Sequence, residues 1–162
     1  MSTPQPAVRS LPVAAGDSAA DFTLQNQDRQ DWSLAAAIKE GDVVLCFFPF
    51  AFTGVCGTEM KCISREMAEW QKKGAQVVGI SCDSPFVLKA WAQAEGFAHP
   101  LLSDLHRTVC KAYGIHWADM NTTNRATIII AKGADGRGKV KWVQTRQPGS
   151  AMNWDEVLAK VA

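Results

Sequence analysis

The order of elements between residues 43 and 60 constrains this chain more than any other sequence feature. Val43–Phe48 is apolar at every position, which predicts a central strand covered by helices on both faces. Pro49 and Gly54 bound a short loop, and a helical pattern follows it. Cys56 stands at the junction of loop and helix. The chain therefore predicts an α/β fold with one cysteine at a helix start.

The helical pattern after the loop indicates a single helix as far as Gly74. Its apolar positions, at spacings of four, three, four and three, are Cys56, Met60, Ile63, Met67 and Trp70. A strand over Val77–Ser81 follows, and Ser84 and Pro85 are typical of the start of a second helix that ends at Gly96. The expected buried face of that helix is Val87, Leu88, Trp91 and Ala92. This order predicts a parallel βαβ unit.

Shorter patterns complete the expected fold. They are a strand over Phe22–Leu24, a helix over Leu34–Lys39 capped by Ser33, a helix from Asp104 to Tyr113, a hairpin of Thr127–Ile130 with Val140–Gln144, and a last helix beginning at Asn153 with Glu156 in a capping box. We expect one α/β domain over residues 16–162, with a mixed central β-sheet flanked by helices. Residues 1–15, which contain Pro4, Pro6 and Pro12, are expected to form an irregular N-terminal arm.

Charge and apolar patterning exclude several function classes. Seventeen basic and sixteen acidic residues give a net charge of +1 without a block of like charge, so we expect neither nucleic-acid nor membrane-surface binding. The longest apolar run, Val43–Phe52, is too short to span a bilayer and contains Pro49. Because that run cannot span a bilayer and no continuous apolar region follows Arg9, we expect a cytoplasmic location. Five cysteines are an odd number in a chain of 162 residues, which favours reduced or catalytic thiols.

The position of Cys56 favours a reactive thiolate. Unpaired backbone N–H groups and the positive end of the helix dipole stabilise negative charge at a helix start. Thr53 offers a hydroxyl three residues before the sulfur, and Gly54 allows the backbone to approach closely. The plainer interpretation is that Cys56 is a structural, half-buried thiol.

These residues also carry a family resemblance. The pattern Pro49-x-x-x-Thr53-x-x-Cys56 resembles the active-site signature of the peroxiredoxins, and Phe47–Met60 is most similar to their AhpE-like one-cysteine group. Asp21–Leu24, Val77–Ser81 and Asn124–Thr127 resemble further segments of the family, so the likeness covers roughly residues 12–162. The resemblance implies a thioredoxin-like fold and a thiol-dependent peroxidase that acts on hydrogen peroxide, organic hydroperoxides or peroxynitrite.

The resemblance also implies roles for five residues. Cys56 would be the nucleophile, and the Thr53 hydroxyl with the Cys56 peptide N–H would orient the peroxide oxygens. Arg125 would stabilise the thiolate and the transition state, while Pro49 would keep water from the sulfur. Glu59 either orients Arg125 or only supports the helix start, and both readings stay open.

The other cysteines are expected to leave recycling to an external thiol or redoxin. Cys62 is a candidate resolving cysteine, but it lies on the polar face of the helix, six residues from Cys56. Cys46 is expected in the core, and Cys82 and Cys110 as core or half-buried thiols. The three histidines show no ligand spacing and no Cys-x-x-Cys is present, so we expect no metal and no other cofactor.

Two classes of function remain at this stage. The first is the peroxidase, whose Cys56 sulfenic acid an external thiol would reduce. The alternative is a non-catalytic thioredoxin-like module that binds a partner or senses oxidant. Apolar Phe50, Phe52 and Trp117 near the site, together with the family resemblance, also predict a homodimer.

Overall fold

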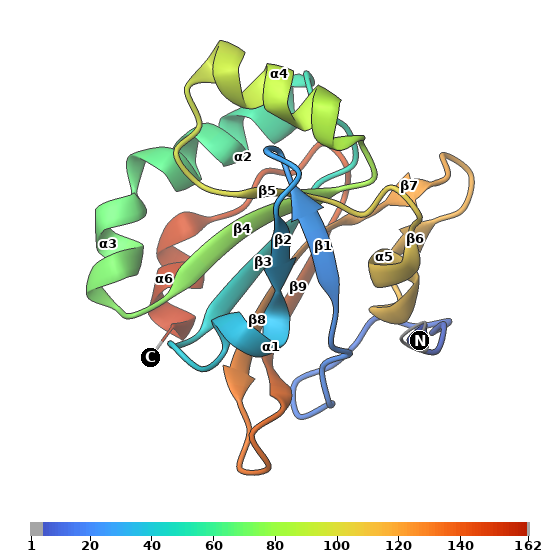
Figure 1. Cartoon of the computed structure of the whole chain (residues 1–162), viewed down its shortest axis with the longest axis vertical. Helices are drawn as coiled ribbons and strands as arrows, with labels where there is room; N and C mark the ends of the chain where they lie inside the picture. Colours follow the sequence, from blue (N-terminus) through green and yellow to red (C-terminus); the bar gives the residue numbers. More distant parts are fainter. Residues whose placement is uncertain (1–4, 162) are drawn as a thin grey trace.

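The computed structural model describes residues 5–161 and is built around one seven-stranded sheet, with a separate two-stranded sheet beside it (Figure 1). The strands are β1 (Thr23–Asn26), β2 (Asp31–Ser33), β3 (Val43–Phe47), β4 (Gln76–Ser81), β5 (Leu101–Ser103), β6 (His116–Trp117), β7 (Thr122–Thr123), β8 (Arg125–Lys132) and β9 (Gly138–Arg146). The helices are α1 (Leu34–Ala37), α2 (Gly54–Arg65), α3 (Met67–Lys72), α4 (Pro85–Glu95), α5 (Thr108–Ala112) and α6 (Trp154–Lys160).

The large sheet is mixed, as the sequence predicts. Its strand order is β2-β1-β5-β4-β3-β8-β9, and β3, β4 and β5 run parallel to one another. The outer strands on both sides, β1 with β2 and β8 with β9, are antiparallel. Because β3 and β8 run in opposite directions, the end of β3 lies beside the start of β8. This edge of the sheet carries Cys56 and Arg125.

Strand β3 separates two hydrophobic cores, and all five of its residues are buried. Val43, Leu45 and Phe47 pack with α1 and α5, whereas Val44 and Cys46 pack with α2, α3, α4 and α6. Side chains alternate across a strand, so an apolar run buried on both faces needs helices on both sides. The prediction of a central, doubly covered strand is therefore confirmed.

The predicted helix from Cys56 to Gly74 is wrong in one respect, because the chain bends at Glu66. The Glu66 backbone (φ −94°, ψ 13°) leaves the helical region, so α2 ends at Arg65 and α3 begins at Met67. Hydrophobic spacing cannot detect such a bend, since the apolar stripe continues through it. After the bend Trp70 is fully buried, 5.4 Å from the Trp154 ring of α6.

Other helix predictions are confirmed or corrected locally. Ser33, Ser84 and Asn153 accept hydrogen bonds as N-caps, and Gly96 ends α4 with φ 71°. Val87 was predicted on the buried face of α4 but is 39% exposed. Helix α5 begins at Thr108 rather than after Asp104, because Arg107 intervenes in a left-handed conformation.

The N-terminal segment contains no helix or strand between residues 5 and 15. Two backbone hydrogen bonds, Arg9 N to Lys111 O and Val13 N to Tyr113 O, hold it against α5 and the residue that follows it. The first part of the predicted arm, residues 1–4, lies outside the described residues. Across residues 5–161, the helices are too short or too polar for any of them to cross a membrane.

Candidate active site

Cys56 lies in the first turn of α2, where the sequence predicts it. Thr53 is the N-cap residue, in an extended conformation, and the preceding Phe52 turns the chain with φ 61°. The Cys56 side chain is buried, with 1% of its surface exposed. Its sulfur therefore meets protein groups rather than bulk water.

The principal partner of the sulfur is Arg125, the first residue of β8. Its Nη2 donates to Cys56 Sγ at 3.1 Å, its Nη1 to Glu59 Oε2 at 2.5 Å and its Nε to the Pro148 carbonyl at 3.0 Å. The guanidinium is 2% exposed. The Glu59 carboxylate and the Pro148 carbonyl thus hold the buried guanidinium in one orientation, with its third hydrogen bond directed at the sulfur.

Glu59 joins two arginines in a buried network. Arg146 Nη2 donates to Glu59 Oε1 at 2.9 Å, and the Met152 peptide N–H donates to the same oxygen at 2.9 Å. Glu59 is 1% exposed and Arg146 is 8% exposed at the side chain. This arrangement supports the arginine-orienting reading of Glu59, since a residue that only supported the helix start would not bridge two strands.

The charges of this network do not cancel one another. Arg125 and Arg146 bring two positive charges, and the Glu59 carboxylate brings one negative charge. Buried charges are costly unless they are paired. The network therefore leaves a net positive charge beside Cys56 Sγ.

Arg146 was not predicted from the sequence. It extends β9 two residues beyond the expected end at Gln144 and pairs with Arg125 across the β8–β9 ladder. The sequence could have indicated Arg146 through the register of the predicted hairpin, because extending that hairpin toward Arg125 brings the two arginines to one edge of the sheet.

A cavity of about 250 Å³ opens beside the sulfur. It is lined by Pro49, Phe50, Thr53, Gly54, Val55, Cys56, Trp117, Arg125 and Pro148. The Thr53 hydroxyl donates to the Phe50 carbonyl at 2.8 Å, so its oxygen lone pairs can accept a hydrogen bond from a small ligand. All four predicted catalytic positions, Pro49, Thr53, Cys56 and Arg125, therefore meet in one cavity.

Two other cysteines lie where the sequence places them. Cys46 is buried in β3, and burial raises the pKa of its thiol. Cys62 is partly exposed and accepts a weak contact from Arg65 Nη2 at 3.7 Å. Because Cys56 and Cys62 belong to the same unbroken helix, six residues separate them by about 9 Å of helical rise. This distance argues against a direct bond between them in the folded helix.

His99 belongs to the core. Its Nδ1 lies 2.8 Å from Ser64 Oγ and its Nε2 lies 3.2 Å from Met60 Sδ. Burial lowers the pKa of His99 to about 3. Among residues 5–161, the side chains close enough to share a cation are Cys82, Asp104 and Cys110, a group without histidine.

Comparison with known proteins assigns the family. The sequence model of the AhpC/TSA family matches residues 15–143, most of the chain. The chain is a peroxiredoxin. Alkyl hydroperoxide reductase E of Mycobacterium tuberculosis is 34% identical to this peroxiredoxin over 149 residues, which cover 89% of this chain and 95% of the relative. The chloroplastic 2-Cys peroxiredoxin BAS1 of Hordeum vulgare is 30% identical over 91% of this chain and 73% of its own length.

Solved structures agree with this assignment. The peroxiredoxin superposes on peroxidoxin BcpB of Mycobacterium tuberculosis with a TM-score of 0.81 and 29% identity, covering 91% of this chain and 96% of that one. AhpC of Enterococcus faecalis gives a TM-score of 0.83 at 23% identity over 91% and 90%, which shows the shared fold. The expected thioredoxin-like fold and thiol-dependent peroxidase class are confirmed, and the non-catalytic alternative is not favoured.

Proposed function

We propose that this peroxiredoxin reduces hydroperoxides at Cys56, through a sulfenic acid that an external thiol reduces. The observation that carries the proposal is the Arg125 guanidinium, held 3.1 Å from Cys56 Sγ by its buried pair with Glu59. An arginine fixed in this way stabilises the thiolate before the reaction and the negative charge that develops on the departing peroxide oxygen during it.

The reaction transfers one oxygen to sulfur. The Cys56 thiolate attacks the terminal oxygen of the hydroperoxide, the O–O bond breaks, and the departing alkoxide or hydroxide takes up the proton that the Cys56 thiol had released, leaving as alcohol or water. The Thr53 hydroxyl donates a hydrogen bond to the Phe50 carbonyl, so its oxygen is oriented to accept a hydrogen bond from the peroxide O–H. The Cys56 peptide N–H and the Arg125 guanidinium are the donors for the oxygens that gain charge.

The substrates we infer are hydrogen peroxide, organic hydroperoxides and peroxynitrite. The alkyl hydroperoxide reductase named among the relatives supports the organic class. Phe50, Val55 and Trp117 give the cavity apolar walls that suit an organic group. Pro49 closes the cavity near the sulfur, and its carbonyl is fixed by the Thr122 hydroxyl at 2.8 Å.

For recycling we infer one-cysteine behaviour, with a low-molecular-weight thiol or a redoxin as the reductant. Cys62 cannot approach Cys56 unless the first turns of α2 unwind. The attacking thiol forms a mixed disulfide with Cys56 and releases water, and a second thiol then frees Cys56.

We also infer a homodimer that uses the loop beside the cavity. Phe52 is 60% exposed there, and Phe50 and Trp117 are partly exposed. Sedimentation at tens of micromolar tests this inference, and a monomer at that concentration would contradict it. The cytoplasmic location stays a prediction from the sequence, and cell fractionation tests it.

The decisive experiment follows Cys56 through one turnover. The protein is treated with one equivalent of hydroperoxide in the presence of a sulfenic-acid trap, and the labelled peptide is identified by mass spectrometry. Label on Cys56 supports the proposal, and Cys62→Ser is the matched control because it leaves the proposed site intact. A rapid, complete Cys56–Cys62 disulfide would refute one-cysteine recycling, and label on another cysteine alone would refute the site.

A further inference from the structure

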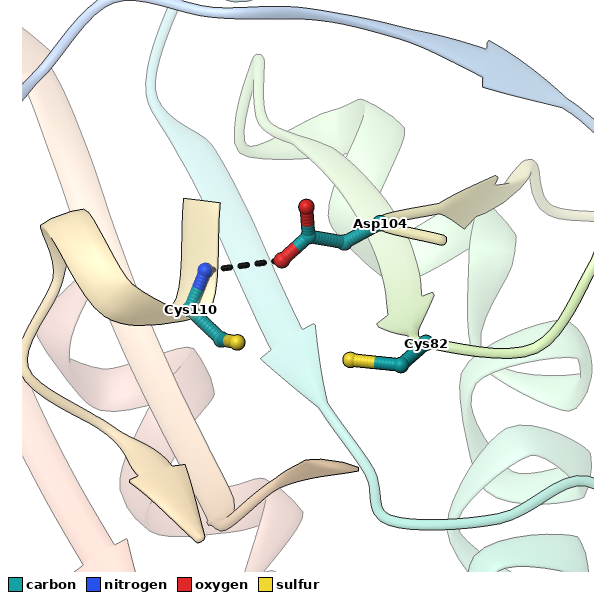
Figure 2. Close-up of side chains that lie close together, drawn as sticks. All are labelled: Cys82, Asp104 and Cys110. Atoms are coloured by element: carbon teal, nitrogen blue, oxygen red, sulfur yellow. Dashed lines mark hydrogen bonds between the residues drawn. The ribbon is translucent and has the colours of Figure 1, made fainter. Parts of the chain in front are cut away.

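Three side chains from separate segments converge at the edge of the sheet next to the active-site loop. Cys82 directly follows β4, Asp104 directly follows β5, and Cys110 belongs to α5, as Figure 2 shows. Their sulfur and carboxylate atoms lie within 4.8 Å of one another. The three residues are 6%, 1% and 0% exposed, respectively. No role in the Cys56 site accounts for this cluster.

Backbone contacts hold the two thiols face to face. Strands β4 and β5 are parallel neighbours, so Cys82 and Asp104 emerge side by side. The Asp104 carboxylate accepts the Cys110 peptide N–H at 2.8 Å and the Val109 N–H at 3.1 Å, which fixes α5 against the two strand ends. The sulfurs of Cys82 and Cys110 therefore point toward one another in the folded chain (Figure 2).

The two thiols differ in acidity. Hydrogen bonding with the Cys110 side chain holds the pKa of Cys82 below its usual value, and the Thr122 hydroxyl acts in the same direction. The same contact with Cys82, followed by burial, raises the pKa of Cys110. Burial also raises the pKa of Asp104. Cys82 is thus the better nucleophile of the two, and Cys110, whose Sγ donates to the Arg107 carbonyl at 3.6 Å, keeps its proton.

We propose that Cys82 and Cys110 form a second redox site, which a hydroperoxide oxidises to an intramolecular disulfide. The inference takes its oxidant class from the proposed function but uses none of the Cys56 machinery. The two sulfurs lie within 4.8 Å of one another, and forming the disulfide requires them to approach to about 2.05 Å.

The electrons and atoms balance over two steps. The Cys82 thiolate attacks one hydroperoxide oxygen, the O–O bond breaks, and the alkoxide leaves as alcohol with the proton that Cys82 had released. Cys110 then gives its proton to Asp104 while its sulfur attacks Cys82, and the S–O bond breaks. The leaving hydroxide takes the proton from Asp104 and becomes water. Two thiols lose two electrons, and one hydroperoxide gains them.

A soft cation is the competing occupant of the same cluster. Structural zinc sites use four protein ligands, and this cluster offers two sulfurs and one carboxylate. The carboxylate already accepts the two N–H groups and, at 3.4 Å, the Thr108 hydroxyl. The cluster is thus one protein ligand short of a structural zinc site, which favours the disulfide over the cation.

The test uses full-length Cys56→Ser protein, so that the proposed peroxidase site is silent. It is freed of metal with a chelator, treated with tert-butyl hydroperoxide, unfolded, alkylated and digested. The expected product is a peptide pair joined through Cys82 and Cys110, which dithiothreitol separates. A further Cys46→Ser change, at another buried thiol, should keep the product, and a further Cys82→Ser change should remove it.

Three outcomes would overturn the inference: both thiols remaining alkylatable after peroxide, a disulfide that involves Cys62 instead, or bound zinc that blocks both thiols in the untreated protein. Differential alkylation of the unmutated protein repeats the measurement without any substitution, so a misfolded variant cannot decide the result. Failure here is separable from failure of the proposed function. A trapped Cys56 sulfenic acid with reduced Cys82 and Cys110 overturns only the second redox site. A Cys82–Cys110 disulfide without any trapped Cys56 sulfenic acid overturns only the proposed function of Cys56.

Discussion

The Cys56 and Cys82 sites place similar sulfurs in different electrostatic surroundings. Cys56 faces the Arg125 guanidinium, which Glu59 holds in place. Cys82 faces a second thiol and the Asp104 carboxylate. Both sulfurs are nearly inaccessible, at 1% and 6% exposure, so burial does not distinguish them.

The neighbouring charges therefore decide what each sulfur can do. Two arginines and one carboxylate at Cys56 leave a positive charge that a thiolate balances and that a departing oxygen anion can share. At Cys82 the nearby Asp104 carboxylate opposes negative charge, whereas the side chains of Cys110 and Thr122 and the positive charge of Arg107 favour the thiolate. The first arrangement suits rapid attack on peroxide, and the second suits slow oxidation completed by an adjacent thiol.

The largest expected effect is that of Cys56→Ser. Because a hydroxyl at this position is a far weaker nucleophile than a thiolate, peroxide reduction should be abolished. Peroxide consumption with excess external thiol measures it. If Cys56→Ser kept the rate while Cys82→Ser lost it, Cys82 and not Cys56 would be the peroxide-reducing cysteine, and the contrast drawn between the two sites would be wrong.

The next effect in size is that of Arg125→Ala. Loss of a fixed donor to developing negative charge should slow the reaction about 10²-fold to 10³-fold. Arg125→Lys should recover part of the rate, because it restores charge without the planar fork. The second-order rate constant with hydroperoxide measures both variants, and thermal unfolding checks that they are folded. An unchanged rate in Arg125→Ala would show that the arginine charge does not account for the different reactivity expected of Cys56 and Cys82.

Glu59→Gln tests whether Glu59 positions Arg125 or only supports the helix. Removing the carboxylate leaves two buried arginines without their counter-charge, so the free energy of unfolding should fall by about 3–5 kcal/mol. The rate constant should fall about tenfold, because the guanidinium is no longer fixed. Denaturant unfolding and rate measurement are compared for the same variant. Lower stability with an unchanged rate would leave Glu59 a purely structural residue.

Thr53→Val should have a smaller effect on the rate. It removes one oriented hydroxyl while nearly preserving the side chain's shape, so the loss is about one hydrogen bond, or roughly tenfold at most. Thr53→Ser keeps the hydroxyl and is the matched control. Equal rates for the two variants would exclude the Thr53 hydroxyl from substrate orientation.

The sequence predicts best those parts of the molecule that are local. The apolar run of β3, the caps of α4 and the junction at Cys56 all follow from spacing and residue type, and the structure agrees. Strands β2, β5, β6 and β7 were not predicted, because two or three residues cannot show a period. Their pairing is set by neighbouring strands rather than by their own composition.

The contacts that build the two sites are the less predictable part. Arg125 was found through family resemblance, but Arg146 meets Glu59 only because the β8–β9 register brings it there. Cys82 and Cys110 are 28 positions apart in the sequence, and each alone is typical of a core thiol. Their contact follows from the adjacent ends of β4 and β5 and from the Asp104 hydrogen bonds that hold α5 against them, which no local pattern encodes.

The smallest expected effect is that of Cys82→Ser on the reaction at Cys56. The two sites are linked through Thr122, which interacts with Cys82 and donates to the Pro49 carbonyl at 2.8 Å. Serine keeps a polar hydrogen-bonding group beside Thr122, so Pro49 should stay in place and the rate constant at Cys56 should change by no more than about twofold. The rate is measured by rapid mixing with one equivalent of hydroperoxide, and Cys62→Ser provides the comparison variant. A tenfold loss in Cys82→Ser alone would show that the thiol pair controls the active-site loop through Thr122, and the two sites would then act as one coupled unit.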